Sequence, residues 1–191
     1  MAELGIATLG EVPPNEKEWI YEIKWDGYRA LAFCNKQIVH LLSRNNKSFN
    51  DKFYAIRQTL ETLNLNTVLD GEIVVVKESG VSSFEGLQDW RSEADGELVY
   101  YVFDILWLNG YDLTQLPLQQ RKTILQTIVP KEGPIKFSAS FDTTASQFLK
   151  AAKKMELEGM IAKKSDSTYH PGARSENWLK IKVQKRHEVV P

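Results

Sequence analysis

The sequence predicts an α+β fold in which mostly antiparallel sheets carry helices on their outer faces. Two stretches, 67–76 and 98–108, are rich in β-branched or aromatic residues and have the length and apolar content of buried strands. Other segments place apolar residues at helical spacing, for example Phe53, Ile56 and Leu60. Strands and helices in this order are consistent with an α+β architecture.

The first part of the chain predicts three strands and a helix. The opening through Asn15 contains Pro13 and Pro14 and is expected to be an irregular lead-in. The predicted elements are a strand at 19–24 that ends at the turn 26–27, a hairpin of 28–35 and 37–43 that turns at 35–36, and a helix that Asn50 or Asp51 caps and that runs through Leu63.

The rest of the chain predicts the two long strands, three helices and a final pair of strands. Ser82 or Ser83 and Thr143 or Thr144 are the expected caps of two of these helices. The predicted elements are strands at 67–76 and 98–108, a short helix through Leu87, a helix from Pro117 through Ile128, a helix at 145–157, and strands at 160–164 and 178–183 around the loop 165–177.

Length and composition favour one compact domain with a substantial core. The 191 residues are 42% hydrophobic and carry 24 basic against 25 acidic side chains, so the net charge does not indicate a nucleic-acid partner. Basic residues are nevertheless concentrated between 150 and 186, which suits a phosphate-facing surface. A solvated helix face explains the part at 150–154 equally well.

The cysteine count and the hydropathy pattern bear on the compartment. One cysteine, Cys34, excludes an internal disulfide and fits a reducing cytoplasm, and its apolar surroundings indicate a small buried side chain. The three histidines have no metal-ligand spacing. No secretory pattern at 1–12 and no apolar run of membrane-spanning length occurs. We therefore expect a cytoplasmic monomer without a membrane partner.

The run 24–29, Lys-Trp-Asp-Gly-Tyr-Arg, carries the strongest chemical signal. It places Lys24 beside a carboxylate, a turn glycine and Arg29, which are the groups needed for an amine to attack a phosphate. Lysine is a nucleophile only in its neutral form, which burial and nearby positive charge favour. Asp26 lies two residues from Lys24 and can orient the amine, since residues i and i+2 of an extended segment share a face. A solvated lysine at a strand end is the alternative.

Five further short motifs follow this run in order: 43–45, 69–72, 103–104, 158–163 and 178–182. The ordered set resembles the covalent nucleotidyltransferases, and among them the ATP-dependent DNA ligases, over 19–183. The segments 21–29, 100–106 and 174–182 most resemble the ligase domain of bacterial ligase D, an end-joining enzyme. The resemblance implies a nucleotidyltransferase (ATP-grasp-like) adenylation fold, with two mostly antiparallel sheets, flanking helices and the nucleotide cleft between the sheets.

Several residues of these motifs suit nucleotide chemistry on physical grounds. Glu72 lies in a strand built for burial, where an unpaired charge is costly, so a cation or ribose partner is expected. Lys180 and Lys182 alternate onto one strand face and can grip an α-phosphate, although lysines also guard solvated strand edges. Phe103 can stack on a base or simply pack in an aromatic strand. Trp178 is expected to pack in the core.

The resemblance assigns roles residue by residue. It implies an attack by Lys24 on the α-phosphate of ATP that gives lysyl-AMP and pyrophosphate, with Mg²⁺ or Mn²⁺ bound. Glu22 would contact the adenine edge unless it faces solvent, and Arg44 and Arg174 would hold nucleic-acid backbone unless they are ordinary surface arginines. The implied sets are Lys24, Asp26 and Lys182 for catalysis; Glu22, Ile23, Lys24, Arg29, Glu72, Phe103, Lys163, Lys180 and Lys182 for the nucleotide; Glu72 and Glu158 for the metal; and Arg44 and Arg174 for DNA.

The expected organisation is a lead-in at 1–18, an adenylation domain at 19–183 and the start of a linker at 184–191. In the family an OB-fold domain follows here, so we expect a domain that seals nicks weakly on its own. The implied partners are nicked or broken double-stranded DNA, with Ku and the companion domains of ligase D, at the bacterial nucleoid. A GTP-using capping guanylyltransferase, an RNA ligase and a non-catalytic nucleotide- or DNA-binding module remain the alternatives.

Overall fold

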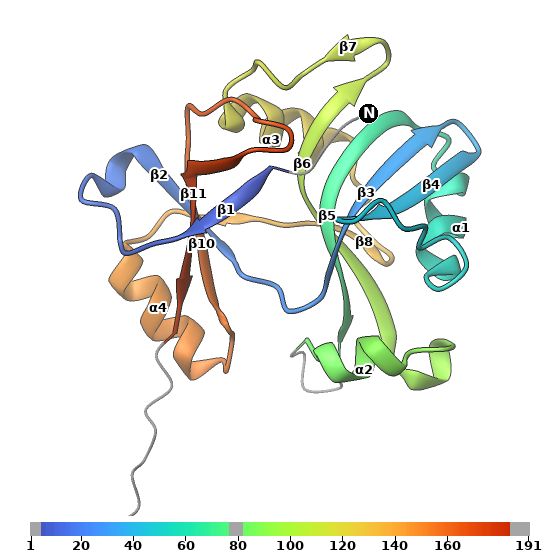
Figure 1. Ribbon diagram of the computed structural model, residues 1–191, viewed down its shortest axis with the longest axis horizontal. Helices are drawn as coiled ribbons and strands as arrows, with labels where there is room; N and C mark the ends of the chain where they lie inside the picture. Colours follow the sequence, from blue (N-terminus) through green and yellow to red (C-terminus); the bar gives the residue numbers. More distant parts are fainter. Residues whose placement is uncertain (1–4, 77–81, 184–191) are drawn as a thin grey trace, which may run out of the picture.

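The computed structural model describes residues 5–76 and 82–183. Within these residues two β-sheets stand side by side, with helices against their outer faces (Figure 1). The five-stranded sheet A has the order β1-β11-β10-β2-β9, and the six-stranded sheet B has the order β4-β3-β5-β6-β7 with β8 beside β6. The strands are β1 (Ile6–Leu9), β2 (Trp19–Ile23), β3 (Tyr28–Asn35), β4 (Ile38–Ser43), β5 (Asn66–Val76), β6 (Glu97–Leu108), β7 (Tyr111–Asp112), β8 (Ile135–Phe137), β9 (Ser140–Phe141), β10 (Gly159–Lys164) and β11 (Arg174–Lys182).

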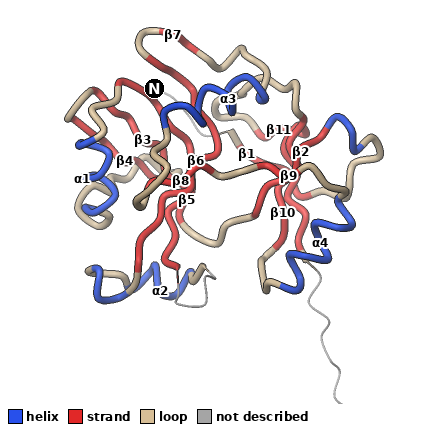
Figure 2. The backbone as a smooth tube through the Cα atoms, turned by 180° about the vertical axis from the view of Figure 1, so that it is seen from behind, coloured by secondary structure: helices blue, strands red, loops and turns tan. Residues whose placement is uncertain are grey.

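The predicted α+β fold with mostly antiparallel sheets is confirmed. The pairs β2–β10, β10–β11, β3–β4, β3–β5 and β5–β6 are antiparallel, whereas β1–β11 and β6–β8 are parallel. The chain leaves sheet A after β2 and enters sheet B at β3, so the predicted turn at Asp26–Gly27 connects the two sheets (Figure 2). The helical segments are η1 (Glu16–Glu18), α1 (Tyr54–Thr62), α2 (Phe84–Asp89), η2 (Glu93–Asp95), α3 (Leu118–Ile128) and α4 (Ala145–Lys154).

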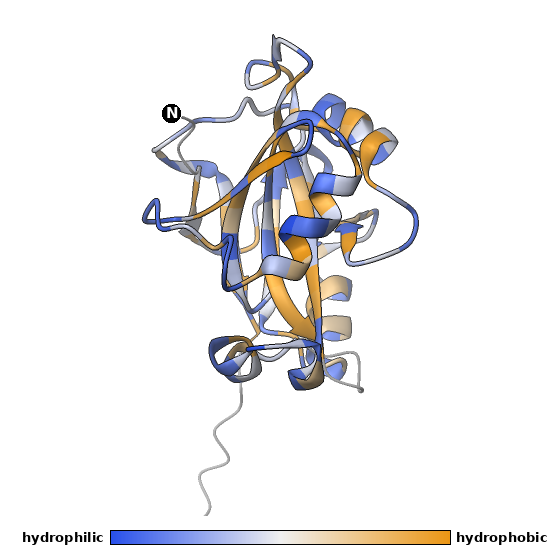
Figure 3. Cartoon of the chain, turned by 90° about the vertical axis from the view of Figure 1, so that its right-hand side faces the viewer, coloured by the Kyte–Doolittle hydropathy of each residue, from blue (hydrophilic) through white to orange (hydrophobic). Residues whose placement is uncertain are grey.

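Each sheet buries its outer face under helices. In sheet B, apolar residues of β3, β5 and β6 pack against α1 and α3, with Ile56, Leu60 and Leu125 fully buried. In sheet A, Tyr21 and Met160 pack against Phe148 of α4. Figure 3 shows apolar residues concentrated along the long strands, with mixed residues along the helices, as expected for amphipathic helices on a sheet. The inner faces of both sheets are therefore left for the cleft.

Two predictions of local structure were wrong in the first part of the chain. The irregular lead-in contains β1, whose four residues gain their pairing from distant β11 rather than from a local pattern. Neither Asn50 nor Asp51 caps α1, which has no side-chain cap, because the Asn50 side chain bonds Leu41 N–H and Val39 C=O instead. Ser83 and Thr144 do cap α2 and α4.

The C-terminal elements also differ in extent. The strand predicted at 178–183 begins at Arg174, because pairing with β1 extends it beyond the β10 pairing. α4 ends at Lys154 rather than 157, where Glu156 adopts φ 57° and turns the chain toward β10. The short strands β7, β8 and β9 were not predicted, since two or three residues carry too little periodicity.

We predict that Gly27→Ala lowers the free energy of unfolding by about 1–3 kcal/mol, because the added methyl group must displace packed backbone. A Cβ at Gly27 would lie 2.1 Å from the carbonyl oxygen of Ile73. Gly86→Ala in α2 is the matched control, since its Cβ would come no closer than 3.3 Å to the Ser83 hydroxyl and alanine favours a helix. Urea denaturation measures both variants; equal stability of the Gly27 variant and wild type would contradict the close approach.

Candidate active site

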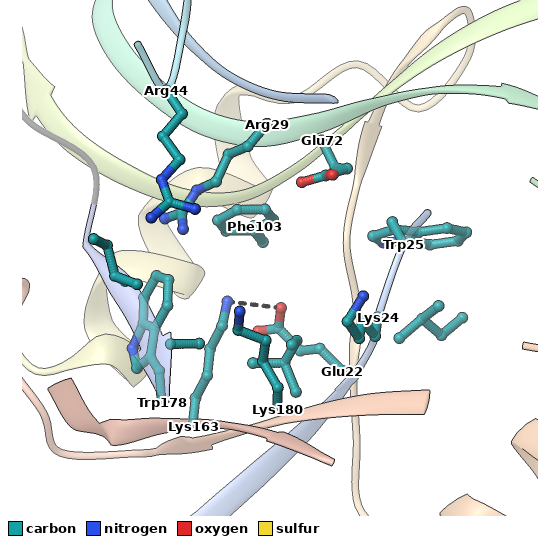
Figure 4. A pocket seen from close by; sticks show the side chains of 14 residues that line it. Glu22, Lys24, Trp25, Arg29, Arg44, Glu72, Phe103, Lys163, Trp178 and Lys180 are labelled. Carbon is teal, nitrogen blue, oxygen red and sulfur yellow. Dashed lines mark hydrogen bonds and ion pairs between the residues drawn. The ribbon is translucent and has the colours of Figure 1, made fainter. Parts of the chain in front are cut away.

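A cavity of about 230 Å³ lies between the inner faces of the two sheets (Figure 4). Sheet A contributes residues of β1, β2, β10 and β11, and sheet B contributes residues of β3, β5 and β6. The lining residues are Ile6, Ala7, Glu22, Ile23, Lys24, Trp25, Arg29, Arg44, Glu72, Phe103, Ile161, Lys163, Trp178 and Lys180. Most of the predicted nucleotide-binding residues therefore meet in one place.

Lys24 is held at the end of β2, where the chain crosses from sheet A to sheet B. Its backbone N–H donates to the Gly159 carbonyl (3.1 Å), and its ammonium forms an ion pair with Glu158. The other carboxylate oxygen of Glu158 lies 4.0 Å from Nζ of Lys182. The structure thus brings together the predicted nucleophile, the predicted metal ligand and the predicted phosphate-binding lysine.

Glu22 is buried behind the cavity and is held by two lysines. Its Oε1 accepts from Lys122 (2.7 Å) and its Oε2 accepts from Lys163 (2.9 Å). Burial acts to raise the pKa of Glu22, but the two ammonium groups overcome it and hold that pKa below its usual value. Glu22 is 2% exposed, so the alternative of a solvent-facing strand residue is wrong.

Aromatic rings and cations alternate along one side of the cavity. Lys163 Nζ lies 4.3 Å from the ring centroids of both Phe103 and Trp178, which contact each other edge to face. Burial lowers the pKa of Lys163, although Glu22 acts in the opposite direction. Phe103 and Trp178 are both core residues and cavity walls, so the expected core packing of Trp178 is confirmed, and the stacking of Phe103 on a base stays a prediction.

Arg29 is fixed by a network on the sheet B wall. Its guanidinium forms a two-pronged ion pair with Asp70 (3.0 and 2.6 Å) and donates to the Gly5 carbonyl (2.6 Å). Tyr169 donates to the same carboxylate (2.7 Å) and accepts from the Gly5 N–H (2.8 Å). Although burial opposes it, Asp70 raises the pKa of Arg29 above its usual value. With two of five N–H groups unused by these bonds, Arg29 can still donate to a ligand.

Glu72 occupies the opposite wall and differs from Glu22 in its surroundings. It points into the cavity (Figure 4), and among the described residues the ion pairs of the site involve Glu22, Asp70 and Glu158 but not Glu72. Burial raises the pKa of Glu72 to about 8, although Arg29 and Lys24 act in the opposite direction. Burial makes the charged form of this carboxyl group costly, and the nearby side chains offset only part of that cost. A bound cation would offset the rest.

The remaining predicted residues lie nearer the mouth of the cavity. Arg44 and Lys180 line it, and burial together with Lys24, Arg174 and Arg44 lowers the pKa of Lys180. Arg174 and Lys182 are exposed on β11, and Asp26 lies beyond the lining residues but close enough to Glu72 to raise its pKa. Lys185 and Arg186, the end of the predicted basic cluster, lie outside the described residues, as does the predicted linker at 184–191.

Sequence reasoning missed three residues that complete the site. Trp25 lines the cavity, stacks on Tyr101 at 3.6 Å between centroids and donates to the Ser138 hydroxyl (3.1 Å). Asp70 was overlooked beside Glu72 in the same motif. Lys122 carried a usable signal, because a lysine four residues after Leu118 and three before Leu125 falls on the buried face of the helix.

The donor set fits a hard divalent cation that retains water. Within 5–76 and 82–183, no group of three or more histidine, cysteine or carboxylate side chains could enclose a metal ion. Mg²⁺ commonly takes one or two carboxylates together with substrate phosphates and waters. Glu72 supplies a carboxyl group that lacks an ion pair of its own, and Glu158 supplies one that is shared with Lys24.

The two-sheet fold and the lysine-bearing cleft define a domain of the nucleotidyltransferase fold. Residues 9–182 match the family described as the ATP dependent DNA ligase domain, which is most of the chain. The chain therefore belongs to the ATP-dependent DNA ligase domain family.

Relatives and solved structures agree with this assignment. The chain is 37% identical over 189 residues to the multifunctional non-homologous end joining protein LigD of Pseudomonas aeruginosa, covering 97% of this chain and 22% of that protein. It is 30% identical over 173 residues to the SPbeta prophage-derived DNA ligase-like protein LigB of Bacillus subtilis, covering 88% and 63%. The crystal structure of the ligase domain of M. tuberculosis LigD superposes with a TM-score of 0.85 at 32% identity, covering 95% and 60%.

A mycobacterial DNA ligase D complexed with ATP and MES superposes with a TM-score of 0.86 at 32% identity, covering 95% of this chain and 60% of that one. The chain thus spans under two thirds of the length of these relatives and structures. In the described parts of the chain, no helix has the length and apolar character needed to cross a membrane.

We predict that wild-type stability falls between about pH 4.5 and pH 8 more steeply than that of an E72Q variant. The folded protein keeps a proton on Glu72 up to a pKa of about 8, whereas the unfolded chain loses it near the usual 4.5. The unfolded state then binds fewer protons, so raising the pH costs stability across this window. Chemical denaturation at pH 5 and pH 8 measures the difference, and parallel changes in both proteins would contradict it.

Proposed function

We propose that this chain carries out the first step of DNA ligation, in which Lys24 becomes covalently linked to AMP. The observation that carries the proposal is the position of Lys24: its backbone is anchored to Gly159 and its amine opens into a cavity walled by Phe103, Glu22 and Arg29. The family is ATP-dependent, and a relative with this fold was solved with ATP. Holding both reactants in a fixed geometry is the main source of rate in such a reaction.

The proposed step balances as an in-line displacement. The lone pair of the neutral Lys24 amine attacks the α-phosphorus, a P–N bond forms, and the bond from that phosphorus to the oxygen shared with the β-phosphate breaks. Pyrophosphate leaves, and the amine gives up a proton to solvent, because Glu158 is proposed to leave Lys24 for the metal ion. The AMP would then pass to the 5′-phosphate of a DNA nick, and the 3′-hydroxyl would displace it.

The cavity offers separate groups for each part of the nucleotide. Phe103 presents a ring for stacking, and Glu22 with the backbone at Ile23 lies at the end of β2 where the base edge would be read. Arg29 has free donors for ribose hydroxyls, and Lys180 faces the same cavity for the α-phosphate. Three more residues have supporting roles in this proposal. Lys163 places a positive charge near the base, and Lys182 places one near the phosphates. Asp26 orients the amine of Lys24.

Glu72 and Glu158 are the proposed ligands of a Mg²⁺ or Mn²⁺ ion. When bound, such an ion neutralises phosphate charge and so favours attack by an electron pair. Glu72 would be held in its anionic form by the cation, which offsets the cost of burying that charge. Glu158 would exchange its contact with Lys24 for a contact with the ion.

The proposed substrate, partners and location rest on the relatives and not on the geometry of the site. Relatives named as end-joining proteins suggest nicked or broken double-stranded DNA as the substrate, with Ku and companion ligase D domains as candidate partners, in the bacterial cytoplasm at the nucleoid. We propose a monomer with its adenylation domain at 19–183, preceded by a lead-in at 1–18 and followed by a linker. Because the chain spans only part of these relatives, nick sealing by the chain alone is expected to be weak.

We predict that intact wild-type protein gains the mass of one AMP after incubation with ATP and Mg²⁺, and that Lys24→Ala gains none. The protein is first treated with pyrophosphate, which reverses any existing adduct, and intact-mass spectrometry reads the result. Lys17→Ala is the matched control, because Lys17 is an exposed lysine outside the cavity. An AMP adduct on the Lys24 variant would show that another residue is the nucleophile.

We predict that Arg44→Ala and Arg174→Ala each weaken binding to a nicked duplex and reduce the dependence of log Kd on log salt by about 1, as expected for loss of one phosphate contact. Both arginines act on Lys180 at the mouth of the cavity. Arg57→Ala is the control, since Arg57 pairs with Glu61 on α1 over the outer face of sheet B. Salt titrations of fluorescence anisotropy measure the slopes; unchanged slopes in both variants would exclude a backbone contact.

A further inference from the structure

Lys122 has no place in the chemistry described so far, yet it bonds Glu22, one of the residues that line the cavity. It projects from α3, is 6% exposed and does not line the cavity. Its ammonium donates to Oε1 of Glu22 (2.7 Å) and to the Ser138 carbonyl (2.9 Å), and it lies 4.7 Å from the Phe137 ring centroid. A buried cation with three such contacts can act on a ligand only through the groups it holds.

The two lysines hold the Glu22 carboxylate in complementary ways. Lys122 takes one oxygen and Lys163 the other, so rotation of the carboxylate is restricted from both sides. Each carboxylate oxygen can accept more than one hydrogen bond, so an acceptor site remains. The two lysines together set the direction in which the Glu22 carboxylate can accept a further hydrogen bond.

A single lysine would already neutralise Glu22, and the second one leaves an excess buried positive charge. Such an excess is costly, so charge balance alone does not account for Lys122. Burial lowers the pKa of Lys163, although Glu22 acts in the opposite direction. Lys122 gives Glu22 a second donor, on the carboxylate oxygen to which Lys163 does not donate.

The position of Lys122 is itself fixed. Its neighbour Arg121 is fully buried and forms a two-pronged ion pair with Asp104 of β6 (2.8 and 3.0 Å), which sets the register of α3. On the far side, Ser138 connects Lys122 to the nucleophile's surroundings, because the Ser138 hydroxyl accepts from Trp25 beside Lys24. Lys122 therefore supports residues on both sides of Lys24 in sequence, Glu22 and Trp25.

We propose that Lys122 is a positioning residue that sets nucleotide specificity: it fixes the Glu22 carboxylate as an acceptor for an exocyclic amino group, and so selects adenine over guanine. Adenine carries an amino donor where guanine carries an oxo acceptor. An anionic acceptor held in place attracts the first and repels the second, and a site built to bond a donor rejects ligands that lack it. The inference rests on the proposed function, because it takes Glu22 to face the base of ATP.

The test compares ATP, GTP and purine riboside triphosphate, which lacks the amino group, in lysyl-nucleotide formation by wild type, K122M, K122R and E22Q. Selectivity is the ratio of kcat/KM values measured on one protein, so partial unfolding of a variant cancels. We expect K122M to reduce the preference for ATP over purine riboside triphosphate about tenfold, mainly through the KM for ATP, consistent with loss of one well-directed hydrogen bond. K122R should keep most of the preference for ATP. The double variant E22Q/K122M should lose no more of this preference than E22Q alone.

L125A is the matched control, because it removes a buried side chain of the same helix, one turn beyond Lys122, that packs in the core of sheet B and not on Glu22. It should change stability but leave the selectivity ratio at the wild-type value. K122Q replaces K122M if the methionine variant does not fold. A wild-type ratio in K122M and K122Q, or an equal loss in L125A, would overturn the proposal.

Isothermal calorimetry separates this inference from the proposed function. If wild type binds ATP but forms no adduct, the covalent step is refuted, and the ratio of dissociation constants for ATP and purine riboside triphosphate tests Lys122 in the same variants. If wild type forms the adduct and K122M keeps its selectivity, the inference alone fails. If wild type binds none of the three nucleotides, both proposals fail.

Discussion

The relative position of the two sheets depends on two adjacent buried cations of α3, each of which bonds a different sheet. Arg121 bonds Asp104 of β6 in sheet B, and Lys122 bonds Glu22 of β2 in sheet A. Buried ion pairs stabilise little in net terms, but removing one partner leaves an uncompensated charge and is strongly destabilising. The two pairs therefore tolerate little displacement, and the relative position of the inner faces, and with it the cleft, follows from one turn of one helix.

A second network of buried polar groups forms the wall of the cavity on the side of sheet B. Arg29, Asp70 and Tyr169 come from β3, β5 and the segment between β10 and β11, and Arg29 and Tyr169, which both bond Asp70, also bond the backbone of Gly5 just before β1. The N-terminal strand thus closes the cavity with Ile6 and Ala7 while its neighbour Gly5 satisfies the Arg29 network. The two networks meet at Phe103 and Trp178, whose rings lie between Arg29 and Lys163.

The sequence predicted the elements and residues that a local pattern records. It did not predict those whose position depends on a partner far away in the sequence. The long strands, the caps at Ser83 and Thr144 and most cavity residues could be predicted, because periodicity and short motifs record them. β1 could not, since its pairing with β11 joins residues about 170 positions apart. The role of Asp70 could not be predicted for the same reason, because its partner Arg29 lies 41 residues away. The helical spacing of Lys122 indicated that it is buried, but not that it pairs with Glu22, 100 residues away.

The contact between Lys24 and Glu158 links nucleotide entry to activation of the nucleophile under the proposed function. The ammonium group of Lys24 directs its protons at Glu158 in this ion pair and has no free lone pair with which to attack a phosphorus atom. Glu158 is also a candidate metal ligand, and Lys182 lies near its second oxygen, so three cationic groups compete for one carboxylate. If Glu158 held the ion that accompanies a nucleotide, it would give up its contact with Lys24 near the place where the α-phosphate would arrive, so the amine would become free only when its target is present.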